Sequence, residues 1–322
     1  MTGHLVNAIG RLGRAWLLAL GGMTVFTSAL AQGGDRCPPQ AGTPDRQLLM
    51  QAQQQAADRG FLWRISRGGR DSFLYGTLHA GQADWFALGP RVEAALHRTG
   101  VLALEVNLTD PSVLQAVEQA MNRPAWPLPS ALMQSLRQAW SAECLPVSDL
   151  DTGPVELHVT RLAVVRAQRE GLFPIYGAES LLLMRSLAAQ RPVVGLEQVE
   201  DQMQALLARS QPEAETLVRE ALKELAHPEA DKVLKRLVGA WNRSDLGDLE
   251  RYGNWCQCLT TASQREQHAR LIDARNPGMA DAIERLHRDV SVFAAVGALH
   301  MIGPQGLPAL LQARGFVVSR VF

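Results

Sequence analysis

Short apolar runs alternate along the chain with longer segments in which apolar residues recur every three or four positions. The first two runs, over 61–65 and 72–75, enclose Arg67-Gly68-Gly69-Arg70 and predict a β-hairpin whose glycines supply positive backbone angles. The later runs are continuous and apolar, which favours buried strands. They cover 101–106, 193–196, 291–296 and 316–321.

Helical periodicity fills the intervals between these runs. Asn276-Pro277 is typical of a helix start, with Asn as the N-cap, and Gly315 is typical of a helix end. Helices are predicted over 45–58, 89–98, 111–121, 129–140, 154–169, 177–189, an almost unbroken tract 198–288, and 306–314. The pattern predicts an α/β fold, with a central, mostly parallel sheet flanked by helices and a large helical segment inserted before the last strands.

The first 31 residues are expected to be a signal peptide. Arg11 and Arg14 precede an apolar stretch, and Ala29-Leu30-Ala31 fits a cleavage site, so we expect cleavage after Ala31. The stretch is shorter than the roughly 20 residues that span a membrane. An uncleaved anchor is the alternative.

The remaining chain is interpreted as a leader and helix over 32–59 followed by one α/β domain over 60–322, with a helical lobe over 198–288. We expect an exported protein, periplasmic or secreted, with no stable membrane insertion after cleavage. The 322 residues carry 32 basic and 32 acidic groups and only 6% aromatics. A nucleic-acid partner is not expected, because such proteins present a basic face.

Four cysteines in an exported chain favour disulfides. They are Cys37, Cys144, Cys256 and Cys258, and three pairings are open. A Cys256–Cys258 bridge would close a very tight ring, so each of these two is expected to pair elsewhere.

Two similar elements carry the candidate chemistry. Gly76-Thr77-Leu78-His79 and Gly297-Ala298-Leu299-His300 each follow a predicted strand, and a second glycine follows each histidine within three residues. Ligands of open α/β sheets bind beyond the carboxyl ends of the strands. The sequence lacks the signatures of the zincins, the nucleophile-elbow hydrolases, the P-loop and the dinucleotide-binding proteins.

Two carboxylates occupy comparable places. Glu105 lies in the run Leu102-Ala103-Leu104-Glu105-Val106, and Glu197 ends the run that starts at Val193. If the strands are parallel neighbours, these carboxylates and the two imidazoles share one rim. Two imidazoles with one or two carboxylates form an open ligand set for a divalent metal ion such as zinc.

Simpler roles remain open for several of these residues. His79 and His300 could each be structural, and Glu197 could serve a helix N-terminus. Arg275 could hold a substrate carboxylate or stabilise an oxyanion, or it could be solvated. Asn276 is expected to be a cap. The other histidines in helical segments are expected at the surface: His97, His158, His227, His268 and His287.

Together with Phe61-Leu62-Trp63, Val194-Gly195-Leu196-Glu197 and Asp273-Ala274-Arg275-Asn276, the two histidine elements resemble the TraB/GumN family over about 60–322. The resemblance implies an α/β fold similar to the erythromycin esterase and ChaN-like group. It also implies kinship with the animal TIKI proteins, which are metal-dependent peptidases that favour manganese or cobalt. His79, His300 and Glu105 match their two histidines and glutamate. Asn107 departs from the pattern, because many relatives carry a second acidic residue there.

Our leading hypothesis is an exported metal-dependent hydrolase, a peptidase, that acts on a peptide or small-molecule substrate. His79 and His300 would bind the metal ion, Glu105 would be a third ligand or the general base, and Glu197 would orient them. One alternative is a metal-free esterase-like hydrolase in which Glu105 orients His79 as the base. Another is a non-catalytic protein that binds a metal ion, a haem-like group or a peptide.

Overall fold

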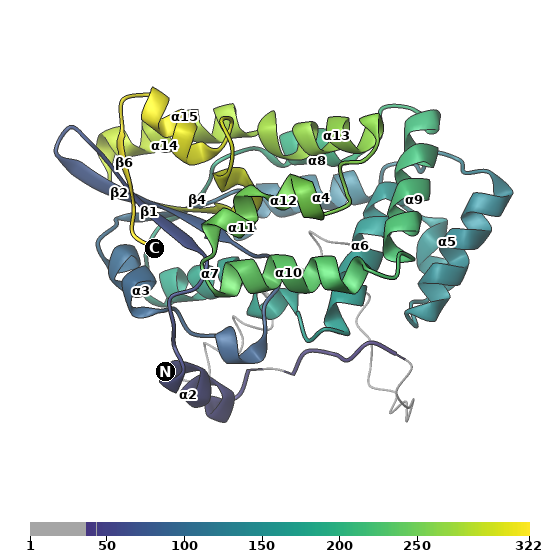
Figure 1. Cartoon of the computed structure of the whole chain (residues 1–322), viewed down its shortest axis with the longest axis horizontal. Helices are drawn as coiled ribbons and strands as arrows, with labels where there is room; N and C mark the ends of the chain where they lie inside the picture. Colours follow the sequence, from purple (N-terminus) through teal and green to yellow (C-terminus); the bar gives the residue numbers. More distant parts are fainter. Residues whose placement is uncertain (1–36, 43) are drawn as a thin grey trace.

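The computed structural model describes residues 37–42 and 44–322, so the predicted signal peptide lies outside the described residues. Within them, six strands form one mixed sheet. The strands are β1 (Phe61–Arg67), β2 (Arg70–Thr77), β3 (Val101–Leu104), β4 (Val193–Gly195), β5 (Val292–Gly297) and β6 (Val317–Arg320). Each predicted strand is therefore present. The sheet lies at one end of the molecule, and α5, α6 and α9 lie at the other (Figure 1).

The α-helices of the described chain surround and extend this sheet. They are α2 (Arg46–Gln54), α3 (Pro90–His97), α4 (Pro111–Met121), α5 (Ser130–Ala142), α6 (Val155–Gln168), α7 (Ala178–Ala188), α8 (Val199–Leu206), α9 (Gln211–Leu225), α10 (Ala230–Asn242), α11 (Leu246–Glu250), α12 (Tyr252–Trp255), α13 (Ala262–His268), α14 (Asn276–Asp289) and α15 (Leu307–Ala313). None of them is long and apolar enough to cross a bilayer.

The strand order β4-β3-β5-β2-β1-β6 explains where the helices lie. β4, β3, β5 and β2 run parallel, and β1 is antiparallel to both β2 and β6. Crossovers between parallel strands are right-handed. The path β2 to β3 to β4 therefore places α3 and α7 on one face, and the return to β5 places α14 on the other. Figure 1 shows α14 and α15 above the sheet and α3 and α7 below it. The predicted fold class is confirmed.

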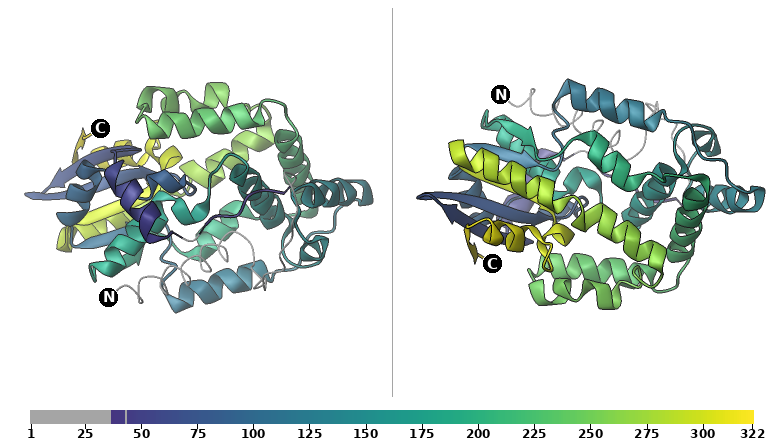
Figure 2. Two further views of the ribbon diagram at one scale, coloured as in Figure 1. Left: turned by 90° about the horizontal axis from the view of Figure 1, so that it is seen from below. Right: turned by 90° about the horizontal axis from the view of Figure 1, so that it is seen from above.

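The centre of the sheet joins the two ends of the chain. β5 inserts between β3 and β2, so strands from early and late in the sequence lie side by side (Figure 2). All six residues of β5 are buried, as expected for a strand covered on both faces. The edge strand β6 instead exposes Val317. Side chains of the sheet, α3, α7, α14 and α15 form one continuous core with Trp241 of α10.

The tract over 198–288 is less regular than predicted. It consists of seven α-helices, α8 to α14, with a π-helical turn over Ala269–Asp273 between α13 and α14. The amide of Ala274 donates to the carbonyl of Ala269 at 2.8 Å, a bond that spans five residues instead of four. The predicted end of the last helix at Gly315 is confirmed, since that glycine has a φ of 83°.

The expected disulfide pairing is wrong. Cys256 and Cys258 bond to each other, and Cys37 bonds to Cys144. Gln257 takes a left-handed φ of 56°, so the chain folds back and brings the Cα atoms of Cys256 and Cys258 to 5.1 Å, within the range of a disulfide.

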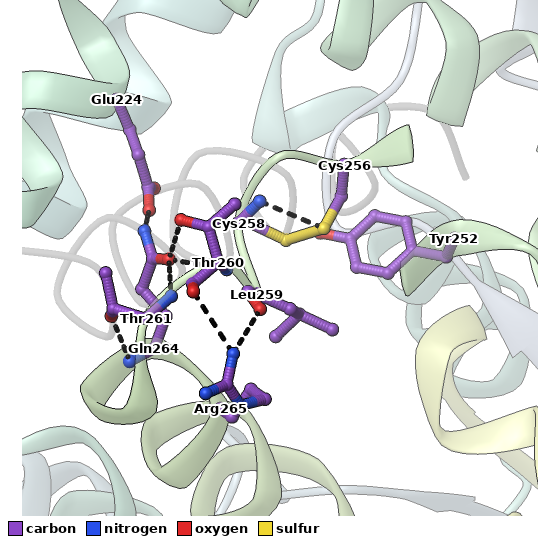
Figure 3. Close-up of a disulfide and its surroundings, with 9 residues drawn as sticks. All are labelled: Glu224, Tyr252, Cys256, Cys258, Leu259, Thr260, Thr261, Gln264 and Arg265. Carbon is purple, nitrogen blue, oxygen red and sulfur yellow. Dashed lines mark hydrogen bonds between the residues drawn. A yellow bond between two sulfur atoms is a disulfide. The ribbon is translucent and has the colours of Figure 1, made fainter. Parts of the chain in front are cut away.

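This disulfide turn leads directly into α13 (Figure 3). The Tyr252 hydroxyl lies 3.2 Å from Cys258 Sγ. Three residues after Cys258, Thr261 forms a capping box with Gln264 at the helix N-terminus, which satisfies amide groups that the first turn leaves without partners. The entry to α13, and hence to the π-helical turn, is therefore fixed on both sides.

Candidate functional site

The four candidate acid–base residues lie where parallel strands end. Glu105 directly follows β3, His79 lies two residues beyond β2, and Glu197 lies two residues beyond β4. His300 lies on a 3-10 turn, Ala298–Met301, that continues β5. The register aligns Thr77 with Gly297 and Leu104 with Gly195, so the strand ends are level. The structure therefore brings these residues to one rim of the sheet.

Gly297 lies at the point where three of these side chains meet. A methyl group added at Gly297 would lie 3.3 Å from Glu105 Oε1 and 3.6 Å from both His79 Nε2 and His300 Cδ2. Its amide donates to Glu105 Oε1 at 2.8 Å. The absence of a side chain at Gly297 therefore leaves open the space between the three functional groups.

Arg275 joins the two carboxylates of the rim. Its Nη2 lies 2.6 Å from Glu105 Oε2, and it also bonds both oxygens of Glu197, with Nε 3.0 Å from Oε2. Only 11% of the Arg275 side chain is exposed. Gln202 donates to Glu105 at 3.1 Å and to Glu197 at 2.8 Å. Arg275 is therefore engaged within the site, and Glu197 acts on the site through it.

His79 is held by a buried carboxylate. Its Nδ1 lies 3.0 Å from Glu179 Oε1, on α7, and the Thr77 hydroxyl donates to the same oxygen. The backbone pins the loop as well, since the Ala178 amide donates to the Leu78 carbonyl at 3.1 Å. Because Nδ1 faces Glu179, Nε2 is the nitrogen that faces Gly297. About half of the ring, 54%, is exposed.

His300 is held by a neutral amide. Asn276 donates through Nδ2 to the Gln305 carbonyl at 2.7 Å, so its Oδ1 faces His300 Nδ1 at 2.6 Å. This pattern assigns the proton to Nδ1 and the lone pair to Nε2. His300 Nε2 lies 3.5 Å from Arg275 Nη1, at the outer limit of a hydrogen bond. Only 3% of His300 is exposed.

The surroundings shift the pKa values of the two imidazoles in opposite directions. The charge of Glu179 outweighs burial and raises the pKa of His79 to about 9. Burial lowers the pKa of His300 to about 4, against the pull of Glu105.

The two carboxylates also differ. Burial acts to raise the pKa of Glu105, but His300, His79 and Arg275 outweigh it and lower that pKa to about 2. For Glu197, burial prevails over the bonds to Arg275 and raises the pKa. Glu105 is therefore the carboxylate held in its ionised form.

Two expectations about individual residues are wrong. Asn276 is the first residue of α14, but its side chain bonds His300 and Gln305 instead of capping the helix. His287 is buried, not superficial, and it bonds the Ser72 hydroxyl at 2.8 Å and the Arg67 carbonyl at 3.1 Å. Both side chains bond residues that are distant in the sequence instead of groups in their own helix.

The remaining helical histidines divide into two groups. His97 and His227 are exposed, as expected. His158 and His268 are partly buried, and His158 bonds the Thr152 carbonyl at 2.8 Å.

Glu179 was not predicted as a site residue from the sequence. The signal available was an acidic residue beside the apolar Leu181-Leu182-Leu183, the same kind of signal that singled out Glu105. Gly177, two residues earlier, marks a close approach: a methyl group there would lie 2.3 Å from the His79 carbonyl oxygen.

The chemistry of the donor set suits a divalent metal ion. Each imidazole has Nδ1 bonded to an oxygen acceptor, the arrangement that orients metal-binding histidines. Within the described residues, however, no three His, Cys, Asp or Glu side chains form a ready metal site. His79, Glu105 and His300 therefore suit a metal ion by donor type, and binding would require them to draw together.

Comparison with known proteins identifies relatives of this chain and its family. It is 25% identical over 247 residues to the uncharacterized protein YbaP of Shigella flexneri, covering 76% of this chain and 89% of the relative. The YbaP of Escherichia coli K12 is 24% identical over the same shares. No solved structure matches the chain. The profile of the TraB/PrgY/gumN family matches residues 61–320, which include the whole rim. The chain therefore belongs to the TraB/PrgY/gumN family.

Proposed function

We propose that the protein is an exported metal-dependent hydrolase, a peptidase, whose reaction centre is the space in front of Gly297. The observation that carries this proposal is that two imidazoles and one ionised carboxylate surround Gly297. Both rings have Nδ1 bonded to a buried oxygen acceptor, so Nε2 is the nitrogen turned away from that acceptor. His79 Nε2 faces Gly297, and His300 Nε2 lies 3.5 Å from Arg275 Nη1. The exposed ring of His79 places one side of the centre in contact with solvent.

His79 and His300 would hold the metal ion, with Glu105 as a third ligand or as the base. A bound divalent metal supplies Lewis-acid chemistry, which polarises a carbonyl and activates water near neutral pH. Glu179 and Asn276 fix the ring orientations. The Gly297 amide and Arg275 hold Glu105 in its ionised form, the state that a metal ligand or a base requires.

The geometry disfavours the metal-free alternative. That mechanism requires His79 to be an unprotonated base oriented by Glu105. The carboxylate that bonds His79 Nδ1 is instead Glu179, and it raises the pKa of His79 to about 9. At neutral pH this imidazole therefore favours its protonated form when no metal ion competes for it.

The test measures metal binding and turnover in parallel. The purified mature chain is titrated calorimetrically with Mn²⁺, Co²⁺ and Zn²⁺, and assayed on peptide and ester panels before and after chelation. We expect His79→Ala and His300→Ala to lose both tight metal binding and turnover. His97→Ala, which removes an exposed histidine outside the site, should retain both. Turnover that survives complete chelation would refute the metal dependence, and metal binding without any turnover would refute the hydrolase.

Gly297→Ala offers a second variant that keeps every functional group. The added methyl group would crowd Glu105 Oε1 at 3.3 Å and fill the centre, so turnover should fall strongly while the fold persists. Gly247→Ala is the matched control, because a methyl group at this helical position outside the site makes only ordinary contacts, at 3.7 Å, with Arg251 and Asp245. Equal activity of the two variants would contradict the placement of the centre at Gly297.

A further inference from the structure

A cavity of about 850 Å³ lies directly behind the proposed reaction centre, lined by α8, the π-helical turn and α14. Glu197 and Arg275 line it, and the same Arg275 bonds Glu105 at the reaction centre. Arg275 therefore borders both the cavity and the reaction centre. The volume is that of a site for a small ligand or a few residues of a peptide.

Arginines dominate the polar lining of this cavity, which we call the arginine cavity. Five of them line it, against three carboxylates. The five are Arg123, Arg209, Arg270, Arg275 and Arg285. Positive charge is therefore in excess around the cavity.

The pairing of these side chains leaves part of that charge uncompensated. Arg209 and Arg270 both bond Glu213, and the lining residue Asp281 bonds Arg314, which lies outside the cavity. Among the described residues, the exposed side chains of Arg123 and Arg285 make no ion pair or hydrogen bond with another side chain. The lining carboxylate Asp201 has no arginine partner in that same part of the chain. Two unpaired arginines thus face one unpaired carboxylate.

Arg270 adds an unused donor. Its Nη1 bonds Glu213 at 2.7 Å, but its Nε is buried and has no acceptor within the described chain. A buried N–H group without an acceptor is unfavourable. This one is closed to solvent, so a ligand oxygen would reach it only after the Arg270 side chain moves.

The π-helical turn explains why Arg270 and Arg275 line one cavity. Residues five apart stack on the same face of a π-helix, whereas in an α-helix they point apart. The five-residue hydrogen bond from Ala274 to Ala269 therefore brings both guanidinium groups to the cavity side. π-helical turns are rare and occur frequently at functional sites.

We propose that the arginine cavity binds a carboxylate of the substrate, so that the enzyme prefers acidic peptides. This inference rests on the proposed function, since it assigns a substrate class to the same centre. Arg123 and Arg285, whose side chains have no ionic partner in the described chain, attract the carboxylate. Leu196, Met203 and Met279 provide apolar wall for the adjoining carbon chain.

The test measures binding, separately from turnover. Three probes are titrated calorimetrically into the full mature chain carrying His79→Ala, so that cleavage does not interfere. They are acetyl-Ala-Ala-Glu-Glu-amide, acetyl-Ala-Ala-Gln-Gln with a free carboxyl terminus, and neutral acetyl-Ala-Ala-Gln-Gln-amide. We expect at least one acidic probe to bind about tenfold more tightly than the neutral one at low salt. Which of the two does so distinguishes a side-chain carboxylate from a terminal carboxylate.

The double variant Arg123→Gln/Arg285→Gln should reduce this preference to about twofold or less. The matched control is Arg219→Gln/Arg288→Gln, which removes two exposed arginines that do not line the cavity and should keep the preference. Equal binding of all three probes, or a preference that survives the cavity variant, would overturn the proposal.

The two proposals fail in different ways. Charge-dependent peptide binding with no metal binding or turnover in the wild type would refute the hydrolase and leave the arginine cavity standing. Metal-dependent turnover with no charge preference would do the reverse.

Discussion

The two histidine elements have nearly the same sequence and opposite environments. His79 is half exposed and bonds a carboxylate, whereas His300 is buried and bonds an amide. Their pKa values are accordingly about 9 and about 4. A repeated motif therefore fixes where an imidazole stands relative to its strand, but its surroundings decide its protonation: the charge of Glu179 for His79, and burial for His300. The two copies are equivalent in position and different in chemistry.

Arg275→Gln should have the largest effect on the rim that the two histidines share. The variant leaves the buried carboxylates of Glu105 and Glu197 without their shared cation, which should lower the free energy of unfolding by about 3–5 kcal/mol. It should also raise the pKa of His300, since the Arg275 charge helps to lower it. Urea denaturation measures the first effect and NMR titration the second.

Arg137→Gln is the control for Arg275→Gln, because it removes a single ion pair, with Asp151, in which both side chains are exposed. That change should cost about 1 kcal/mol or less. Equal losses for the two arginines would show that the buried network is not the stronger one.

Asn276→Asp should make the two copies alike. A carboxylate beside His300 Nδ1 should raise its pKa from about 4, toward the behaviour of His79. Asn276→Ala instead leaves the buried Nδ1 and the Gln305 carbonyl without partners, at a cost of about 1–3 kcal/mol. The measurements are histidine NMR titration and urea denaturation, respectively. A His300 pKa that does not move in Asn276→Asp would contradict the role given to the amide.

Glu179→Gln should have the smallest effect, which should be present at acid and neutral pH and disappear at alkaline pH. The raised pKa of His79 contributes stability that is complete below its unfolded value of 6.5 and is lost as the pH rises to about 9. Removing the carboxylate should flatten this loss, by about 1 kcal/mol or less because the ring is half exposed.

The measurement for Glu179→Gln is thermal or urea stability between pH 6 and 10. Glu93→Gln, which removes the carboxylate beside the exposed His97, should follow the wild-type profile. A wild-type slope retained in Glu179→Gln would show that another group is responsible.

The sequence could predict the strands and the position of the rim because both follow from local patterns. A continuous apolar run reports a buried strand, and a polar residue at its end reports the carboxyl edge. Glu105 stood out because an acidic residue in an apolar run needs a partner.

Local sequence patterns could not predict which side chains bond the two histidines or which cysteines pair. Asn276 fits a helix cap in every local respect, and only its 2.6 Å contact with a residue 24 positions later shows its role. Glu179 lies 100 residues from His79, and a single sequence carries no information on that pairing. The Cys256–Cys258 bridge depends on one left-handed residue, Gln257, whose conformation no pattern indicated.

The late position of β5 in the sequence has a consequence for the synthesis and folding of the protein. This strand forms the middle of the sheet, yet it begins at Val292, after nine-tenths of the protein has been synthesised. Until it emerges, β2 and β3 have no common neighbour and His300 is missing from the rim. A nascent or prematurely terminated chain thus cannot assemble the proposed centre. The proposed hydrolytic activity would therefore arise only once synthesis of the chain is almost complete.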